Sequence, residues 1–202
     1  LRERPFVSIH APIFNEKRVV ERLIKACSSQ NWFDEISGRA NFEVVIVDDS
    51  TDTTTEIVKQ KLSEDGRKLT RTVFNEGLEV YVSEVTNGPI IKLIHRFNRQ
   101  GYKGAALGNA MTYIDSRAEY VCVFDADFVP YPDTIEQFMK SFQEACGGLE
   151  KVAESKIAAV QGYQWHVLNK SENWVTRGVR TEYARKTSAR MQKTLPAIWF
   201  NP

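Results

Sequence analysis

The stretch Val121-Cys122-Val123-Phe124-Asp125-Ala126-Asp127 decides the fold that we predict for this chain. An apolar run ends there in two aspartates one residue apart, and two prolines follow soon after. The β-branched and aromatic residues predict a buried strand over 120–124, and the prolines exclude its continuation as a central strand. The two aspartates are therefore expected where a strand opens into a loop. Carboxylates so close together repel each other, which favours a neutralising cation or hydrogen-bond donors beside them.

An apolar strand that ends in polar residues is predicted twice more, earlier in the chain. Alternation over 6–11 predicts a strand that leads into Pro12-Ile13-Phe14-Asn15-Glu16, and the apolar run 42–47 predicts a strand buried on both faces that ends in Asp48 and Asp49. Helices are predicted after both strands, the first capped by Asn15 and the second begun by a capping box of Thr53 and Glu56. The carboxyl ends of parallel strands share one edge of a sheet, and ligands bind at that edge in open α/β sheets.

The remaining elements complete an α/β pattern. We predict an antiparallel hairpin over 71–85, a strand over 90–95, a helix after the basic loop 96–104, a helix over 133–146 stopped by Gly147-Gly148, and a strand over 157–165. The order predicts one α/β domain with a mostly parallel sheet flanked by helices.

Composition limits the classes of function. Hydrophobic content of 42% and charged content of 26% in 202 residues are typical of a soluble globular protein, and a net charge of +1 gives no field that favours nucleic acid. No apolar run approaches the length of a membrane span, and no signal peptide is recognised. The first residue, Leu1, indicates a fragment or a processed chain, and three cysteines in apolar elements indicate reduced core thiols and a cytosolic setting.

The polar strand ends and the basic loop suggest a specific chemistry. Carboxylate oxygens suit Mg²⁺ or Mn²⁺, which keep positions open for phosphate oxygens. The glycines of the loop 96–104 let backbone amides approach an anion at the start of the following helix. Together these features predict a diphosphate bridged by a metal ion. The three histidines show no partner spacing and are expected to be ordinary structural residues.

Taken singly, each feature also has an ordinary structural explanation. Asn15-Glu16 at a helix start is typical of capping, aspartates after a strand form turns, and Lys103 alone is typical of a solvated lysine. Asp125-Ala126-Asp127 is more specific, because two close carboxylates at a buried strand end need a reason. Neither the dinucleotide fingerprint, nor a P-loop, nor a nucleophile elbow occurs in the sequence.

Five segments in order resemble the inverting family 2 glycosyltransferases of the GT-A fold, most of all the processive branch that holds cellulose synthases and plant mannan synthase-like enzymes. Pro12–Glu16 resembles the first nucleotide loop of that family, Val47–Asp52 the second, Arg99–Leu107 its basic loop, Phe124–Pro130 its metal-binding DxD motif, and Val160–Trp165 the strand that follows. The resemblance covers nearly the whole chain.

The resemblance implies roles for individual residues. Pro12, Phe14, Asn15, Glu16 and one of Asp48 or Asp49 are expected to hold the nucleotide, with Lys103 and Gly104 near the diphosphate or the base. Asp125 is expected to face the ribose, the sugar or the metal, and Asp127 to ligate Mg²⁺ or Mn²⁺. The family's later acidic motif, which supplies the catalytic base, and its Gln-x-x-Arg-Trp motif do not occur before Pro202.

The resulting hypothesis is an enzyme that moves a sugar from a nucleotide-diphosphate sugar, UDP in preference to GDP, to a glycan or lipid-linked acceptor. We assign 1–202 to one donor-binding domain, with a nucleotide-sugar-binding core over 1–130 and the start of an acceptor-side region over 131–202. The full-length protein is expected at the cytoplasmic face of a membrane. The alternatives are a sugar-phosphate nucleotidyltransferase and a non-catalytic nucleotide-sugar-binding module of a membrane synthase complex. The segment 170–193 holds seven basic and two acidic residues, which predicts contact with anionic headgroups or a partner.

Overall fold

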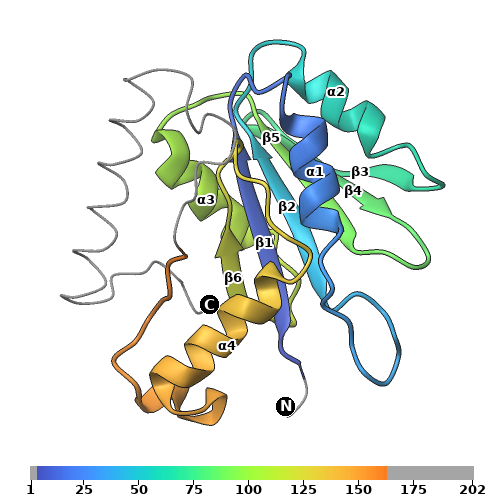
Figure 1. Cartoon of the computed structure of the whole chain (residues 1–202). Coiled ribbons are helices and arrows are strands. Elements are labelled where there is room, and N and C mark those ends of the chain that lie inside the picture. Colours follow the sequence, from blue (N-terminus) through green and yellow to red (C-terminus); the bar gives the residue numbers. More distant parts are fainter. Residues whose placement is uncertain (1–3, 163–202) are drawn as a thin grey trace, which may run out of the picture. The chain divides into compact units, whose positions relative to one another are not determined.

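A computed structural model describes residues 4–162. Residues up to Gln137 form one compact unit, and a second unit begins at Phe138. The first unit holds a six-stranded sheet with the order β3-β4-β5-β2-β1-β6 (Figure 1). Its elements are β1 (Phe6–Ile13), α1 (Val20–Ser28), β2 (Phe42–Asp48), α2 (Thr54–Lys61), β3 (Lys68–Phe74), β4 (Leu78–Glu84), β5 (Ile90–Arg96), α3 (Tyr102–Thr112) and β6 (Ala118–Val123).

The central strands are parallel, as the sequence predicted. β1 pairs in parallel with both β2 and β6, and β2 pairs in parallel with β5. Ile13 of β1 lies opposite Asp48, and Asp48 lies opposite His95 of β5, so three strands end side by side. The hairpin of β3 and β4 joins the far side of β5 in antiparallel pairing, which confirms the predicted excursion from the parallel sheet.

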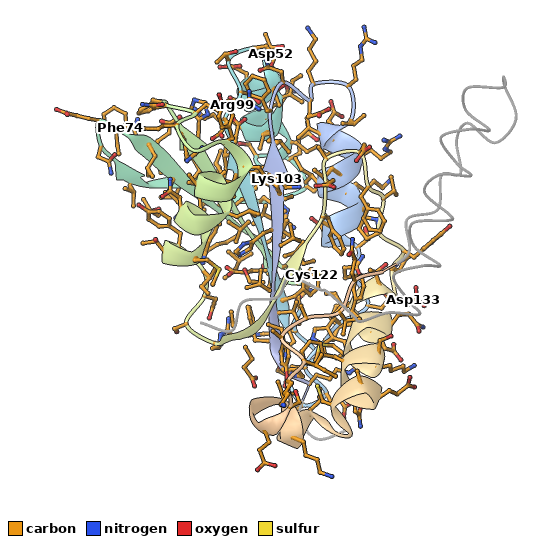
Figure 2. The ribbon with its side chains drawn as sticks, turned by 90° about the vertical axis from the view of Figure 1, so that its left-hand side faces the viewer. Asp52, Phe74, Arg99, Lys103, Cys122 and Asp133 are labelled. Atoms are coloured by element: carbon orange, nitrogen blue, oxygen red, sulfur yellow. The ribbon has the colours of Figure 1, made fainter. Side chains whose placement is uncertain are left out.

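Helices cover both faces of the sheet. β2 is buried along its whole length, as its unbroken apolar run predicted. On one face, Val45 and Val47 of β2 pack in a core cluster with Ala106 and Ala110 of α3. The buried residues of α1 recur at helical spacing (Val20, Leu23, Ile24 and Cys27). Figure 2 shows α1 and α3 on opposite sides of β1.

The strand before the paired aspartates is less central than predicted. β6 stands at the edge of the sheet that the described residues form, where it pairs with β1. Val121, Cys122 and Phe124 are buried as predicted, but Tyr120 is half-buried and Val123 is 37% exposed, so the prediction of a buried strand holds only in part. An apolar run indicates a strand, but it does not distinguish a strand with two neighbours from an edge strand with one.

Both predicted helix caps differ in the structure. Asn15 does not cap α1, because it has a positive φ of 56° and its side-chain Oδ1 accepts from the backbone N–H of Thr51 at 2.9 Å. Its own N–H donates to Ser50 Oγ at 2.8 Å, so it joins two loops instead. Thr53 stands at the N-cap of α2, but its side chain makes no capping bond. The Oδ1 of Asp52 accepts from the N–H of Thr54 at 3.0 Å in its place.

The second unit is described from residue 138 to residue 162. α4 (Thr134–Cys146) enters it and ends at Gly147 and Gly148, both at positive φ, as predicted. A 3₁₀ helix over Leu149–Glu154 follows. Residues 157–162 form no strand, so the predicted strand over 157–165 is wrong for that part. Its remainder and the basic segment 170–193 lie outside the described residues. No helix within residues 4–162 is long and apolar enough to cross a bilayer.

Candidate donor-binding site

A pocket of about 330 Å³ lies at the carboxyl ends of β1 and β6 and at the start of α3. Its lining comes from four separate segments of the chain, as the ordered motifs predicted: Pro12, Ile13, Phe14, Glu16, Asp49, Arg99, Lys103, Ala106, Asp125, Ala126 and Asp127. The structure thus brings together seven of the predicted site residues (Pro12, Phe14, Glu16, Asp49, Lys103, Asp125 and Asp127). It places Asn15, Asp48 and Gly104 outside this lining.

The two aspartates differ in their surroundings. A backbone bond from Phe124 N to His10 O (3.0 Å) continues the pairing with β1, and a bond from Phe128 N to Asp125 O (3.0 Å) then closes a turn. The Asp125 carboxylate forms an ion pair with Lys103 Nζ, and both side chains are about half exposed. Asp127 is exposed, and its carboxylate has no hydrogen bond or ion pair within residues 4–162. The pocket therefore holds one paired and one open carboxylate.

Asp49 follows the end of β2, lines the pocket and is fixed in place by Arg96. Arg96, the last residue of β5, donates from Nε to Asp49 Oδ1 at 2.6 Å and from Nη2 to Oδ2 at 2.7 Å. Both side chains are 5% exposed or less. This two-point geometry is the strong form of a carboxylate–guanidinium pair. It fixes the position of Asp49 and leaves its charge largely compensated.

Asp48 lies outside the pocket lining, in a separate hydrogen-bond network. Its carboxylate accepts from Ser50 N at 2.8 Å and from Thr55 Oγ1 at 2.5 Å, and it lies 3.0 Å from His95 Nδ1. Burial alone would raise the pKa of Asp48, but the bonds from His95, Ser50 and Thr55 outweigh it and hold that pKa below its usual value. The same contact with Asp48 raises the pKa of His95. His95 is thus a structural partner of Asp48, although the sequence showed no spacing that linked them.

Arg99 is a pocket residue that the sequence analysis did not single out. Its guanidinium lies over the Phe14 ring, 3.5 Å from the ring centroid, and 5.3 Å from that of Tyr102. Figure 2 shows Arg99 and Lys103 at the same end of the molecule. The signal was present, because Arg99 lies in the basic loop 96–104. What the sequence could not give is the contact with Phe14, which is 85 positions away and on another strand end.

The loop that carries Arg99 depends on a glycine. Gly101 precedes α3 with a φ of 76°, and a Cβ placed on it would lie 2.5 Å from the Ala105 Cβ. Both the left-handed backbone and this close approach require glycine. The turn at Gly101 sets the direction of α3, so that Lys103 in its first turn faces Asp125.

The donor set of the pocket fits a hard divalent cation. Asp49 is occupied by Arg96, and of the other lining carboxylates (Glu16, Asp125 and Asp127) the two from the loop after β6 lie one residue apart and could together hold Mg²⁺ or Mn²⁺. Two carboxylates leave most octahedral positions for phosphate oxygens and water, which is the arrangement that Mg²⁺ prefers. Within residues 4–162, no cluster of three or more His, Cys, Asp or Glu side chains is arranged to bind a metal.

The family model described as Glycosyl transferase family 2 matches residues 8–195, which includes every segment that lines this pocket. The chain belongs to glycosyl transferase family 2. This family generally uses a divalent metal. The predicted α/β architecture, that of the GT-A enzymes of the family, is confirmed.

Two relatives come from Arabidopsis thaliana. Glucomannan 4-beta-mannosyltransferase 7 is 30% identical over 179 residues, which cover 86% of this chain and 25% of the relative. Probable glucomannan 4-beta-mannosyltransferase 1 is 33% identical over 132 residues, 64% of this chain and 19% of the relative. These relatives place the chain in the mannan synthase-like branch of the family. The chain spans about a quarter or less of their length.

Two solved structures of TarS from S. aureus are also similar. The first, of residues 1–349, has 20% sequence identity and a TM-score of 0.47, and the match covers 82% of this chain and 39% of that one. The second has 19% identity and a TM-score of 0.47, and the match covers 82% of this chain and 23% of that one.

Proposed function

We propose that the pocket at the carboxyl edge of the sheet binds a nucleotide-diphosphate sugar and that the full-length protein transfers its sugar, with inversion, to a glycan or lipid-linked acceptor. One observation carries the proposal. Side chains from four predicted motifs, far apart in the sequence, line a single pocket of about 330 Å³. That volume is within the range of small-molecule sites. Family membership supports the same type of donor.

Each part of the pocket suits a part of such a donor. Phe14, with the Arg99 guanidinium over its ring, offers a flat surface against which a base could stack. Pro12, Glu16 and Asp49 offer an apolar edge and acceptor oxygens for the base and ribose. Lys103 and Arg99 supply positive charge for the diphosphate.

We assign the metal ion to Asp125 and Asp127. A bound Mg²⁺ or Mn²⁺ would stabilise the charge of the departing nucleoside diphosphate. In this proposal Lys103 leaves Asp125 and contacts the diphosphate instead, so that its ammonium group lies beside the leaving group. The roles proposed for this chain are thus donor binding and departure of the leaving group.

The transferred sugar and the base are further proposals. The names of the relatives specify mannosyl transfer in glucomannan, which makes mannose the first sugar to test. The preference for uridine over guanosine stays a prediction from the resemblance. The cytoplasmic face of a membrane stays the predicted location.

The test is a binding panel with this chain. UDP-glucose, GDP-mannose and a TDP-sugar are titrated by calorimetry with and without Mn²⁺, first with the unchanged chain and then with Asp127→Asn. Asp133→Asn is the matched control, because Asp133 follows the same strand but lies outside the pocket lining.

We expect at least one donor to bind, and its affinity to be higher with Mn²⁺ than without it. Asp127→Asn should abolish this effect of Mn²⁺, whereas Asp133→Asn should keep it. Failure of every nucleotide to bind would contradict the proposal. Binding without sugar transfer by the full-length protein would favour the non-catalytic module. Release of diphosphate from a nucleoside triphosphate and a sugar phosphate would favour the nucleotidyltransferase.

A further inference from the structure

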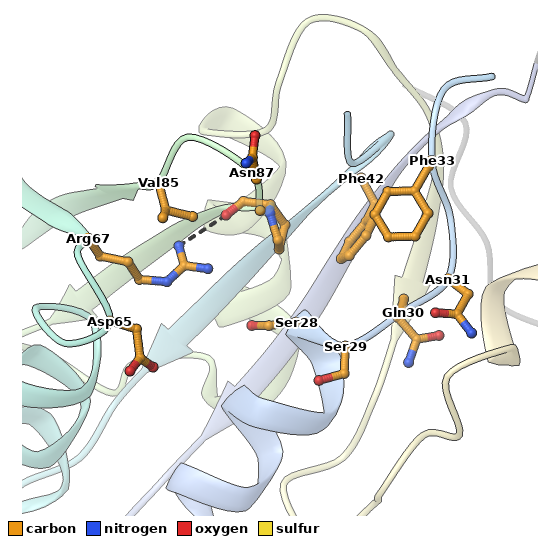
Figure 3. A pocket seen from close by; sticks show the side chains of 12 residues that line it. Ser28, Ser29, Gln30, Asn31, Phe33, Phe42, Asp65, Arg67, Val85 and Asn87 are labelled. Carbon is orange, nitrogen blue, oxygen red and sulfur yellow. Dashed lines mark hydrogen bonds between the residues drawn. The ribbon is translucent and has the colours of Figure 1, made fainter. Parts of the chain in front are cut away.

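A second pocket, of about 470 Å³, lies near the end of α1 and the start of β2, and Figure 3 shows its lining side chains. It is lined by Ser28, Ser29, Gln30, Asn31, Phe33, Phe42, Asp65, Arg67, Val85, Asn87, Gly88 and Pro89. Phe42 is the first residue of β2, whereas Asp49 of the donor pocket directly follows the last. At about 3.3 Å per residue, the two pockets are roughly 20 Å apart. This pocket is therefore separate from the proposed donor site.

Arg67 projects a half-buried guanidinium into this pocket. Its Nη1 donates to the Pro89 backbone carbonyl at 3.1 Å (Figure 3), and no carboxylate within residues 4–162 forms an ion pair with it. Burial lowers the pKa of Arg67 from its usual value, whereas the nearby Asp65 raises it. A guanidinium has five N–H donors, so Arg67 keeps most of them for another partner.

The turn before β5 is shaped to leave space for that guanidinium. A Cβ on Gly88 would lie 2.8 Å from Val85 Cγ1 and 3.3 Å from Arg67 Nη2. Any side chain at this position would displace Val85 or move Arg67. The absence of a side chain at Gly88 therefore keeps both Arg67 and the pocket open.

The wall also holds polar groups that lack protein partners. Ser28 Oγ is buried and has no hydrogen-bond partner within the described residues. The side-chain amides of Asn31 and Asn87 are exposed and make no hydrogen bond within the described residues, so both are open to a ligand. Buried polar groups in native proteins nearly always have partners, so an unpartnered hydroxyl in a pocket wall points to a missing ligand group.

The charges and surfaces of the pocket define the class of ligand. Asp65 and Arg67 are its ionisable lining residues, and their formal charges cancel. Hydroxyl and amide groups supply both donors and acceptors, and Phe33, 40% exposed, supplies an apolar surface. A ligand that matches is uncharged, rich in hydroxyls and apolar on one ring face. An anion would meet the carboxylate of Asp65 and the carbonyl end of α1.

We propose that this pocket is an accessory carbohydrate-binding site for a neutral oligosaccharide, independent of the donor pocket. Arg67, Ser28 and Asn31 bind sugar hydroxyls, and Phe33 covers an apolar ring face. The proposal extends the proposed function, since a chain that builds a glycan would hold glycan at a second place. Its test does not depend on donor binding.

The experiment measures binding of neutral β-1,4-linked trisaccharides of glucose and of mannose by two-dimensional NMR and calorimetry. The variants are Arg67→Met and Gly88→Ala, and Arg22→Met is the control, because Arg22 is exposed on α1 outside the lining. Binding should shift amide signals of residues 28–33, 65–67 and 87–89. Loss of hydrogen bonds from a charged group should weaken binding roughly tenfold or more in Arg67→Met.

Measurements of nucleotide binding separate the proposed carbohydrate site from the proposed donor site. Arg67→Met and Gly88→Ala should keep the nucleotide affinity of the unchanged chain, and Asp127→Asn should keep the trisaccharide affinity. The proposal is overturned if neither trisaccharide binds up to its solubility limit. The proposal is also overturned if trigalacturonate or inorganic phosphate binds more tightly than the neutral trisaccharides. The same holds if Arg67→Met and Gly88→Ala bind the trisaccharides as tightly as the control Arg22→Met.

Discussion

Arg96 and Asp49 join the ends of β5 and β2 through two hydrogen bonds of 2.6 and 2.7 Å, in a place where neither side chain is more than 5% exposed. The pair lies behind the donor pocket, and Asp49 also lines that pocket. This one buried contact thus holds the ends of β2 and β5 together and also fixes the position of Asp49, a residue proposed to contact the nucleotide.

Replacing Arg96 with Met should destabilise the protein strongly. The change leaves the Asp49 carboxylate buried without its partner, and breaking a buried pair from one side costs about 3–5 kcal/mol. Urea unfolding followed by circular dichroism measures the free energy of unfolding. Arg22→Met, on an exposed helix face, is the control and should change it little. A loss below about 1 kcal/mol in Arg96→Met would show that the pair contributes little to stability.

The Asp48–His95 contact predicts a pH-dependent stability. The pKa of His95 is raised above 6.5, so its contribution is complete below pH 6.5 and is lost as the pH rises through the higher folded value. The pKa of Asp48 is lowered below 3.8, so its contribution is present above pH 3.8 and is lost as the pH falls through the lower folded value. The pair should therefore stabilise most between these two ordinary values.

His95→Gln provides the measurement for this pair. The difference in free energy of unfolding between the unchanged chain and the variant should grow as the pH falls from alkaline values toward 6.5. His10 is a second buried histidine, with a pKa lowered to about 4 by burial and by Lys92, but both proteins contain it and the difference removes its effect. A difference that is constant from pH 6 to pH 9 would contradict the raised pKa of His95.

The ion pair of Lys103 and Asp125 predicts opposite effects on two ligands. In Lys103→Met the Asp125 carboxylate loses its cation, so Mn²⁺ alone should bind more tightly than to the unchanged chain. The same variant should bind the nucleotide more weakly, because a charge near the diphosphate is gone. Calorimetric titration with Mn²⁺, and separately with UDP or GDP plus Mn²⁺, measures both changes. Parallel changes in the two affinities would argue against the proposed exchange of Lys103 between Asp125 and the diphosphate.

Much of this architecture could be predicted from local patterns. The apolar run 42–47, the alternation over 6–11 and the turn at Asn75–Gly77 each have a direct physical meaning, and the structure confirms the parallel strands and the hairpin that they predicted. The gathering of polar strand ends follows from parallel pairing alone. The sequence alone therefore predicts that Glu16, Asp49 and Asp127 lie at one edge of the sheet, and the structure places all three in one pocket.

What the sequence did not predict are contacts between loops that are distant in the chain. Asn15 looked like a helix cap because its own neighbours suit one, but its side chain bonds to Thr51. Asp48 and Asp49 are adjacent and identical in type, yet Asp48 contacts His95 outside the pocket lining, whereas Asp49 lines the pocket and pairs with Arg96. Alternation along the strand predicts that the side chains of Asp48 and Asp49 point to opposite faces of the sheet. Which residues of β5 they contact depends on the register between β2 and β5, and no pattern in a single sequence determines that register.

The last prediction concerns the loop after the paired aspartates. Gln30 is 1% exposed, and its Nε2 donates to the Tyr131 carbonyl at 2.9 Å while its Oε1 accepts from the Ile135 N–H at 3.3 Å. The backbone N–H of Asn31 donates to the Pro132 carbonyl at 2.7 Å beside it. These bonds fasten residues 131–135 to the end of α1 and so limit the movement of the segment that begins at Asp127.

Gln30→Leu should therefore loosen that segment. Leucine leaves the Ile135 N–H without its partner, whereas the Tyr131 carbonyl keeps the bond from the Thr134 N–H, and a buried group left unpaired costs about 1–3 kcal/mol. Hydrogen exchange should become faster for amides 128–135 and stay the same in β2 and β5, while Gln60→Leu, an exposed change on α2, should alter neither. Because Asp127 lies just before this segment, Mn²⁺-dependent nucleotide binding should weaken as well. Unchanged exchange over 128–135 would show that the loop is held by other contacts.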